Sequence, residues 1–307
     1  MRRVCFLLAV AVSLLYSCGL SYEEKRRVDQ KERMQRWRED SAALKVAVMP
    51  TMDCLPLFVA KAEHLFSDQG VDVRLKLFTA QMDCDTALAG GSVEGAVTDL
   101  VRAERLKRLG TPLRYVTLTN AYWQLYSNRM QRINRLPQLD DKMLSMTRYS
   151  ATDLLADLAI DSARLQPERV FKIQVNDVGI RLKMLLNNEI DAVLLTEPQA
   201  SLARQAHHRM LMDSRSSALQ LGVVAFREKA LANKQRKAQL GMFLKGYNQA
   251  VDSLNRYGMK RYGHLAAKYC KVREEQLDSV LKNIKYKRVE YPRSEDVSCA
   301  VKWLEKQ

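Results

Sequence analysis

The chain has 307 residues and carries 50 Lys and Arg against 35 Asp and Glu, a net charge of +15. Such an excess is typical of nucleic-acid-binding proteins, but here the basic residues are interleaved with acidic ones and no nucleic-acid-binding motif occurs, so no nucleic-acid partner is expected. The length exceeds that of a usual single domain, about 100–200 residues, and predicts two lobes.

The N-terminus predicts a secretory signal with a lipid anchor. Arg2 and Arg3 precede an apolar stretch at 4–16, which is shorter than the about 20 residues that span a bilayer. The motif LYSC that follows resembles the end of a bacterial lipoprotein signal, in which a small residue precedes the lipidated Cys. We therefore predict a signal peptide at 1–17 and lipidation at Cys18; the alternative is an ordinary signal peptide with an incidental Cys.

The next segment, 18–43, is densely charged and lacks a regular apolar stripe. This composition predicts a solvated tether, frayed or partly helical, between the lipid and the folded part. Glu23 and Glu24 lie close to Cys18 and resemble the surface-export signals of some Gram-negative lipoproteins. We expect a lipid-anchored protein of the Gram-negative cell envelope, facing the periplasm or exposed at the surface.

Strands and helices alternate from Leu44 onward. The run LKVAVM predicts a strand of a buried parallel sheet, and the segments after it predict a helix, a strand, a short helix, a strand, a helix and a fourth strand. In sequence order these segments are PLFVAKAEHLF, VDVRLKLF, DTALAGG, EGAVTDL, LVRAERLKRLG and PLRYVTLT.

A second copy of the pattern follows. MLSMT predicts a strand, and SATDLLADLAIDSA a helix whose start is marked by Ser150 as N-cap and Asp153 three residues on. AVLLTEP is a later strand, and QLGVVAF returns the chain to the first lobe. We assign 44–125 and 220–307 to the first lobe and 126–219 to the second, with the mostly helical C-terminal region packed on the first lobe.

The two copies carry a family resemblance. LKVAVMPTMDCLPLFVAKAEHLFSDQGVDVRLKLF with GGSVEGAVTDL, and DDKMLSMTRYSATDLLADLAI with LLNNEIDAVLLTEP, resemble the solute-binding proteins of ABC transporters, in the group that handles nitrate, sulfonates, taurine and thiamine-pyrimidine precursors. The resemblance covers roughly residues 44–226. It implies an α/β fold, the type II periplasmic-binding clamshell, which closes two lobes over a small organic solute. It also implies a monomer without cofactor that delivers the solute to an ABC permease and its ATPase.

Ligands of such folds bind at the carboxyl ends of the strands, which selects the candidate residues. Ser150 opens a helix whose free N–H groups favour an anion, although plain N-capping also explains this serine. Glu197 in TEP can accept hydrogen bonds from an amino group, although an acid at a helix start is also ordinary. The candidate ligand-binding residues are Thr51, Met52, Asp53, Gln81, Thr98, Asp99, Asn120, Tyr149, Ser150, Thr152, Asn176 and Glu197.

Two features of the sequence bear on the chemical nature of the solute. Arg148 is the only Arg adjacent to these turns, which disfavours a sulfonate or nitrate held by an ion pair and favours a neutral or amino-bearing ligand. Tyr122, Trp123 and Tyr149 offer rings that can stack on a planar ligand, although aromatic residues are more often part of a core.

The cysteines leave one question open. Cys54 and Cys84 each follow a strand of one sheet, whose neighbouring strands lie about 4.8 Å apart, and a disulfide needs Cα atoms within roughly 7 Å. We expect both cysteines near the cleft. Whether they form a disulfide, and whether Cys270 and Cys299 form one, is left open by the sequence. No Cys or His has metal-ligand spacing, so no metal site is expected.

Two other functions remain alternatives. One is a sensor or surface lipoprotein that keeps the clamshell without transport. The other is an enzyme of pyrimidine synthesis on the same fold, which relies on its own His and a Cys-rich motif. This chain lacks the Cys-rich run and shows no catalytic motif, so we expect a binding protein and not an enzyme.

Overall fold

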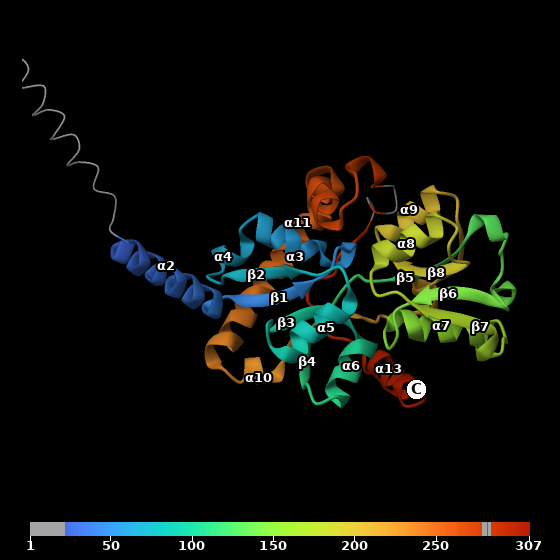
Figure 1. Cartoon of the computed structure of the whole chain (residues 1–307), viewed down its shortest axis with the longest axis horizontal. Helices are drawn as coiled ribbons and strands as arrows, with labels where there is room; N and C mark the ends of the chain where they lie inside the picture. The colour runs from blue at the N-terminus through green and yellow to red at the C-terminus, as the bar shows by residue number, and fades with distance from the viewer. Residues whose placement is uncertain (1–21, 278–280, 282–283) are drawn as a thin grey trace, which may run out of the picture. The chain divides into compact units, whose positions relative to one another are not determined.

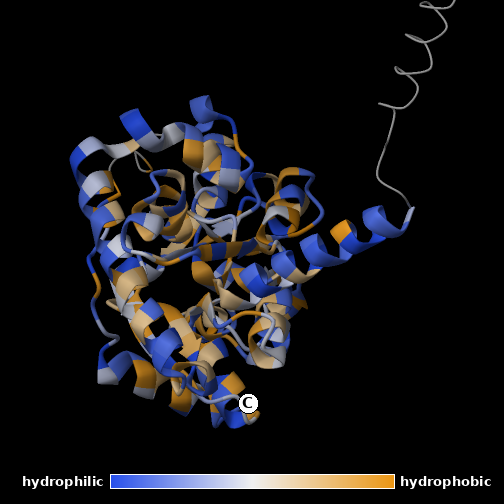
Figure 2. Ribbon diagram, turned by 90° about the vertical axis from the view of Figure 1, so that its left-hand side faces the viewer, coloured by the Kyte–Doolittle hydropathy of each residue, from blue (hydrophilic) through white to orange (hydrophobic). Residues whose placement is uncertain are grey.

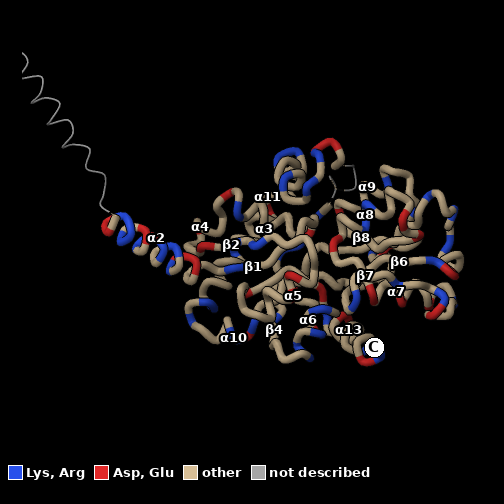
Figure 3. The backbone as a smooth tube through the Cα atoms, in the orientation of Figure 1, with Lys and Arg blue, Asp and Glu red and all other residues tan. Residues whose placement is uncertain are grey.

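The computed structural model describes residues 22–277, 281 and 284–307, so the predicted signal peptide 1–17 and Cys18 lie outside the described residues (Figure 1). The chain divides into two units, one ending at Ala43 and the other beginning at Leu44. In the first unit, the predicted tether forms one continuous helix, α2 (Tyr22–Ala42), which has no buried residue and carries charges of both signs (Figure 3). None of the described helices is long and apolar enough to cross a membrane.

The second unit contains two five-stranded sheets. In the first sheet the strand order is β2-β1-β3-β10-β4, with β1 parallel to β2 and β3, and with β10 antiparallel to β3 and β4. The central strands are apolar and buried on both faces, as expected for a sheet covered by helices on each side. The five strands are β1 (Leu44–Val48), β2 (Val73–Leu77), β3 (Gly95–Asp99), β4 (Leu113–Leu118) and β10 (Gly222–Arg227).

The second sheet repeats the arrangement of the first. Its order is β7-β6-β8-β5-β9, with β6 parallel to β7 and β8, and with β5 antiparallel to β8 and β9. Each sheet therefore places an antiparallel strand, β10 or β5, in the same position. The strands are β5 (Trp123–Ser127), β6 (Lys142–Met146), β7 (Val170–Gln174), β8 (Ala192–Thr196) and β9 (Arg209–Asp213).

The chain crosses between the sheets at 119–122 and again at 214–221. All five residues of β5 belong to the second sheet, so the boundary predicted at residue 125 falls inside a strand. We propose that the first lobe ends at Leu118 and resumes at Gly222. Below, the first lobe is the sheet containing β1 with its helices, and the second lobe is the sheet containing β5 with its helices.

Helices cover both sheets, and the apolar residues are concentrated in the interior, whereas α2 is mostly hydrophilic (Figure 2). The helices of the first lobe are α3 (Leu55–Ala62), α4 (Leu65–Asp68), α5 (Gln81–Gly90), α6 (Leu100–Arg108), α10 (Glu228–Leu231) and α11 (Lys234–Cys270). Those of the second are α7 (Ala151–Ser162), α8 (Val178–Leu186) and α9 (Gln199–Gln205). Short 3₁₀ turns occur at Met52–Cys54, Arg129–Gln131, Leu136–Leu139, Pro167–Arg169, Ser214–Ser217 and Glu274–Gln276.

The C-terminal region is helical and packs on the first lobe, as predicted. Its long helix α11 lies against α3 and α4 and bends at Gly258, where φ is +57°. The last helix, α13 (Ser294–Leu304), contacts α6, where Arg108 Nη2 donates to the Val301 carbonyl at 3.0 Å. It also contacts the second lobe, because Trp303 Nε1 donates to Asp157 Oδ2 on α7 at 3.0 Å. One hydrophobic cluster therefore joins α6, α7 and α13.

Candidate functional site

A small cavity of 40 Å³ lies between strand ends of the two lobes. Its walls are partly polar and partly apolar. The first lobe contributes mainly polar residues, which lie at the ends of β1 and β3 and at the start of α5. The second lobe contributes residues of α8, the end of β8 and Trp123. Five predicted residues line it: Thr51, Asp53, Gln81, Thr98 and Asp99. The other lining residues are Met49, Val97, Ala121, Trp123, Val178, Arg181 and Thr196.

Direct contacts hold the lobes together around this cavity. Met52 N donates to the Glu197 carbonyl at 3.0 Å, and Ala80 forms an isolated antiparallel bridge with Asp177. Asn176 Nδ2 donates to Met82 Sδ at 3.0 Å. The lobes are thus closed on each other, and the predicted residues Met52 and Asn176 lie at contacts between them and not on the cavity wall.

Asp99 is the most closely held residue of the cavity. It ends β3 and caps α6, since its Oδ1 accepts a hydrogen bond from Arg102 N at 3.0 Å. The same oxygen accepts from Ala151 N, at the start of α7 in the other lobe, at 3.0 Å. Its other oxygen, Oδ2, is buried and has no hydrogen-bond partner in the described structure. Burial raises the pKa of the Asp99 carboxyl to about 7, although the Arg102 guanidinium opposes the rise.

The turn before α7 satisfies its own polar groups. Ser150 Oγ donates to the Thr147 carbonyl at 2.7 Å and accepts from Thr152 N at 3.1 Å, which makes Ser150 the predicted N-cap. Thr152 Oγ1 accepts from Thr147 N at 2.9 Å. Both side chains are fully buried and neither lines the cavity. The predicted cap is therefore confirmed, and ligand contact by Ser150 or Thr152 stays a prediction.

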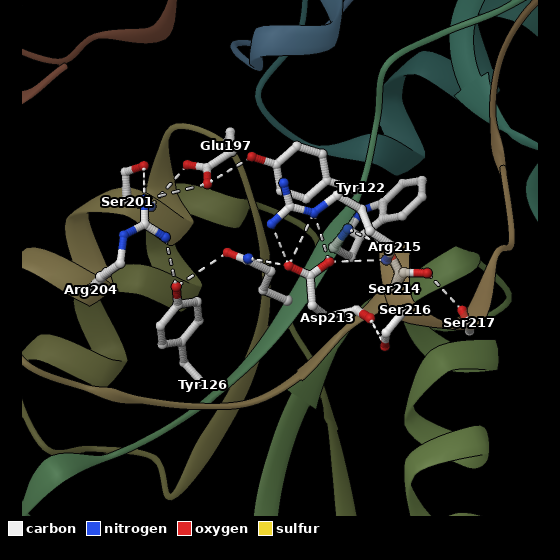
Figure 4. A network of polar contacts seen from close by, with 12 residues as sticks. Tyr122, Tyr126, Glu197, Ser201, Arg204, Asp213, Ser214, Arg215, Ser216 and Ser217 are labelled. Carbon is white, nitrogen blue, oxygen red and sulfur yellow. Dashed lines mark hydrogen bonds and ion pairs between the residues drawn. The ribbon is translucent and has the colours of Figure 1, made fainter. Parts of the chain in front are cut away.

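Glu197 belongs to a second network of polar contacts, which includes Tyr122 in the connection between the lobes (Figure 4). Its Oε1 accepts from the Tyr122 hydroxyl at 3.1 Å and its Oε2 accepts from Ser201 N at 2.9 Å. Arg204 Nη2 lies 3.8 Å from Oε1. Glu197 is 2% exposed, and burial raises its pKa. Both carboxylate oxygens thus have protein partners, and Glu197 joins to Tyr122 in the connection between the lobes.

Beyond Glu197, this network continues to Arg215. The Arg215 guanidinium lies over the Tyr122 ring, 4.2 Å from its centroid, and bonds Asp213 through Nε and Nη2 (Figure 4). Tyr122 therefore presents its face to an arginine, which argues against stacking on a ligand through that face. Trp123, by contrast, lines the cavity.

Asn120 and Tyr149 lie outside the cavity. Asn120 Nδ2 donates to the Lys285 carbonyl and its Oδ1 accepts from Lys287 N at 3.1 Å, so Asn120 fixes the C-terminal segment to the connection between the lobes. Tyr149 has a positive φ of 53°, and its ring lies under the Arg105 guanidinium at 4.7 Å. Ligand contact by either residue stays a prediction.

A larger hollow of 680 Å³ borders Asn120 and Tyr122 and is lined by several basic residues. Its cations are largely occupied: Arg215 pairs with Asp213, Arg293 with Asp296 and Lys287 with Glu290. Because these pairs leave little free positive charge, the smaller cavity between the strand ends is the better candidate for a ligand site.

Arg181 is the charged residue of the cavity that was not predicted from the sequence. It is 2% exposed on α8, and its Nη1 donates to the Leu194 carbonyl at 2.7 Å, while Nε is buried without a hydrogen-bond partner in the described structure. Burial lowers the pKa of Arg181 to about 10. The signal in the sequence was an Arg beside apolar residues in the mostly apolar helix VGIRLKMLL, since an Arg is almost never fully buried without a partner for its charge.

The cavity region collects polar atoms without partners. Buried polar atoms normally have a hydrogen-bond partner, and an unmade bond costs about 1–3 kcal/mol. Four of the cavity's lining residues contribute such atoms: Gln81 Oε1, Thr98 Oγ1, Asp99 Oδ2 and Arg181 Nε. A ligand that supplied hydrogen bonds to these atoms would remove this cost.

The described cysteines are all free. The structure therefore contains neither a Cys54–Cys84 nor a Cys270–Cys299 disulfide. Cys54 Sγ instead accepts a hydrogen bond from Met49 N at 3.4 Å, and Cys84 Sγ lies 3.5 Å from Met49 Sδ. Cys84 lies within α5 and not directly after a strand, because the helix already begins at Gln81. Met49 thus occupies the space between the two thiols.

These features define a class. Two α/β lobes joined by two crossings, with a polar cavity where their strand ends meet, constitute the type II periplasmic binding fold. Residues 51–254, more than half of the chain, match the family model described as NMT1/THI5 like. The chain belongs to the NMT1/THI5-like family. No curated protein sequence matches it.

Solved structures share the fold. The periplasmic aliphatic sulphonate binding protein SsuA from Escherichia coli is 16% identical, with 86% of this chain and 87% of that chain covered and a TM-score of 0.72. The alkanesulfonate-binding protein SsuA from Xanthomonas axonopodis pv. citri, solved bound to MOPS, is 15% identical, with 86% of this chain and 92% of that chain covered and a TM-score of 0.73. The periplasmic nitrate-binding protein NrtA from Synechocystis PCC 6803 is 13% identical, with 81% of this chain and 74% of that chain covered and a TM-score of 0.67. At these identities the likeness establishes the fold.

Proposed function

We propose that this protein is the solute-binding lipoprotein of an ABC importer and that it captures a small organic solute between its lobes. The observation that carries the proposal is the set of buried, unpartnered polar atoms on Gln81, Thr98, Asp99 and Arg181, four residues that line one cavity between the lobes. These atoms come from both lobes, so a solute that bonds them favours the closed form. Such differential binding is what lets a ligand shift an opening equilibrium.

The size of the cavity implies movement. At 40 Å³ it is far smaller than the pockets that hold drug-sized ligands, about 300–1,000 Å³. An organic solute therefore requires the lobes to separate, rotating about the connections at 119–122 and 214–221. In this reading Thr51, Asp53, Gln81, Thr98 and Asp99 bind from the first lobe and Arg181 from the second.

Recovery of the solute tests the proposal. Protein purified from its native host without heating would be denatured and the released small molecules identified by mass spectrometry. A thermal-shift panel of pyrimidines, thiamine intermediates, sulfonates and nitrate accompanies it, because a ligand at a hundredfold excess over Kd stabilises the folded state by about 2.7 kcal/mol. If no solute is recovered and no compound raises the melting temperature, the importer role is lost and the sensor or surface-lipoprotein function takes its place.

The cellular location forms a separate part of the proposal. We propose that Cys18 carries the lipid anchor and that an ABC permease and its ATPase receive the solute at the Gram-negative inner membrane. LYSC after an apolar stretch supports the anchor. Wild type and Cys18→Ala would be expressed in a Gram-negative host and fractionated; the wild type is expected in the membrane and the variant in the soluble fraction. Identical partitioning of the two would contradict the anchor.

A further inference from the structure

The start of α7 has no backbone N–H group left for an anionic ligand. Ala151 N donates to Asp99 Oδ1, and Thr152 N donates to Ser150 Oγ. Asp153 N and Leu154 N both donate to the Ser150 carbonyl, at 3.0 and 3.1 Å. A helix N-terminus is a ready site for an anion, and here a carboxylate of the protein itself occupies that place.

The residue that fills this place also lines the cavity. Asp99 is 1% exposed, and its Oδ2 is buried without a hydrogen-bond partner in the described part of the chain. Gln81 Oε1, a second cavity atom without a partner, is also an acceptor. Two acceptors that lack donors call for a ligand that brings N–H or O–H groups.

The charges on the cavity wall agree with this. Two carboxylates, Asp53 and Asp99, line it, against one guanidinium, Arg181. Burial raises the pKa of both carboxyls, and a cation placed beside them would stabilise their charged forms, whereas an anion would not. Arg181 Nε adds one unpartnered donor, so the ligand also presents one acceptor.

We propose, resting on the importer function above, that Asp99 determines the specificity of the cleft: it excludes anionic head groups from the start of α7 and binds a protonated amine or N–H group of the solute through Oδ2. The solute class is a small amine that also carries a hydrogen-bond acceptor such as a carbonyl oxygen. This differs from the sulphonate and nitrate named for proteins that share the fold.

Two substitutions test this. Asp99→Ser and Asp99→Asn both keep a good N-cap for α6 while removing the charge from the start of α7. Asp72→Asn is the control for the loss of one carboxylate, because Asp72 lies in the first lobe outside the cavity lining, where it pairs with Lys61 and Arg74. Binding of two probes, ethanesulfonate and ethylammonium, would be measured by calorimetry on the folded chain, with melting curves to establish folding.

Ethanesulfonate is expected to bind Asp99→Ser at least tenfold more tightly than wild type or Asp72→Asn, since a charge-assisted hydrogen bond is worth about a tenfold change in affinity or more. Ethylammonium affinity is expected to fall by a similar factor in the Asp99 variants. Equal sulfonate binding by wild type and Asp99→Ser, or an equal gain in Asp72→Asn, would overturn the assignment of Asp99. If one Asp99 variant does not fold, the other decides.

The outcomes separate this inference from the importer function. An anionic solute recovered from the native protein overturns the role of Asp99 and leaves solute binding intact. An amine recovered from wild type but absent from Asp99→Asn supports both. Absence of any recovered solute and of any thermal shift removes the importer function, and the sulfonate affinity of Asp99→Ser then still decides whether Asp99 occupies an anion position.

Discussion

The cleft has two buried acids that make contacts between the lobes, and they are satisfied to different degrees. Glu197 has protein partners on both oxygens, from Tyr122, Ser201 and Arg204. Asp99 uses one oxygen for two backbone N–H groups and leaves the other without a partner. A saturated carboxylate stabilises a structure, whereas an unsaturated one at a cavity is a place where a ligand can contribute free energy.

This difference changes the roles suggested by sequence. Glu197 was predicted to accept an amino group of the ligand, and the geometry gives the unpartnered oxygen to Asp99 instead. Ligand contact by Glu197 stays a prediction that needs its network to rearrange. The difference between Glu197 and Asp99 can be measured, and the largest effect is expected at Glu197, which has more partners.

Glu197→Ala should destabilise the protein by about 2–3 kcal/mol, because buried donors lose a charged acceptor and Arg204 loses its ion pair. Urea unfolding at pH 7.5 measures the change in the free energy of unfolding. Asp99→Asn under the same conditions is the matched control and should change it by much less, since it keeps the N-cap and removes a charge that burial disfavours. Equal losses in the two variants would contradict the distinction.

The pH dependence should come from Asp99. Its pKa in the folded state is about 7, above the usual value near 3.9, so the folded protein binds an extra proton between these values and loses stability as the pH rises through them. From pH 6 to pH 8 this loss is about 1.4 kcal/mol. Arg102 lowers and Asp85 raises the pKa of this carboxyl. Asp99→Asn keeps both of these residues and should flatten the dependence of stability on pH.

The profile is measured from urea unfolding at several pH values on both proteins. A wild-type curve that stays level, or rises, from pH 6 to pH 8 would be inconsistent with a buried Asp99 that is raised to this pKa. An Asp99→Asn curve parallel to the wild type would assign the slope to other groups.

Tyr122→Phe should have the smallest effect, about 1 kcal/mol, because it removes one hydrogen bond to Glu197 and keeps the ring under Arg215. Thermal unfolding measures it. Tyr291→Phe is a suitable control, since Tyr291 is 67% exposed and should leave the melting temperature unchanged. A Tyr122→Phe protein as stable as wild type would remove the hydroxyl from the network that holds Glu197.

Local patterns predicted much of the fold. Ser150 was assigned as an N-cap from SATD, and it caps α7. The repeated order of strands and helices predicted two α/β lobes, because apolar periodicity and turn residues act over a few residues. The boundary at residue 125 fell inside β5, since the start of a strand depends on its partners β8 and β9, which are distant in sequence.

The contacts of the site were harder to predict. The strand-end rule placed Asp99 at the cleft, but the distance between its carboxylate and Ala151 N depends on how the lobes meet. Arg181 was missed because strand ends were searched and this residue lies on α8. The sulfur contacts of Met49 with Cys84 likewise follow from packing, which explains why two nearby thiols remain unbridged.

The C-terminal helix α13 has a mechanical consequence for opening. Two connecting segments alone let one lobe rotate about the line through both of them, but α13 is attached to α6 by Arg108 and to α7 by Trp303. This third attachment resists any rotation that separates α6 from α7. The motion that admits a solute must therefore either detach Trp303 from Asp157 or pivot on α13, which favours separation at the side of the cleft that lies farthest from this helix.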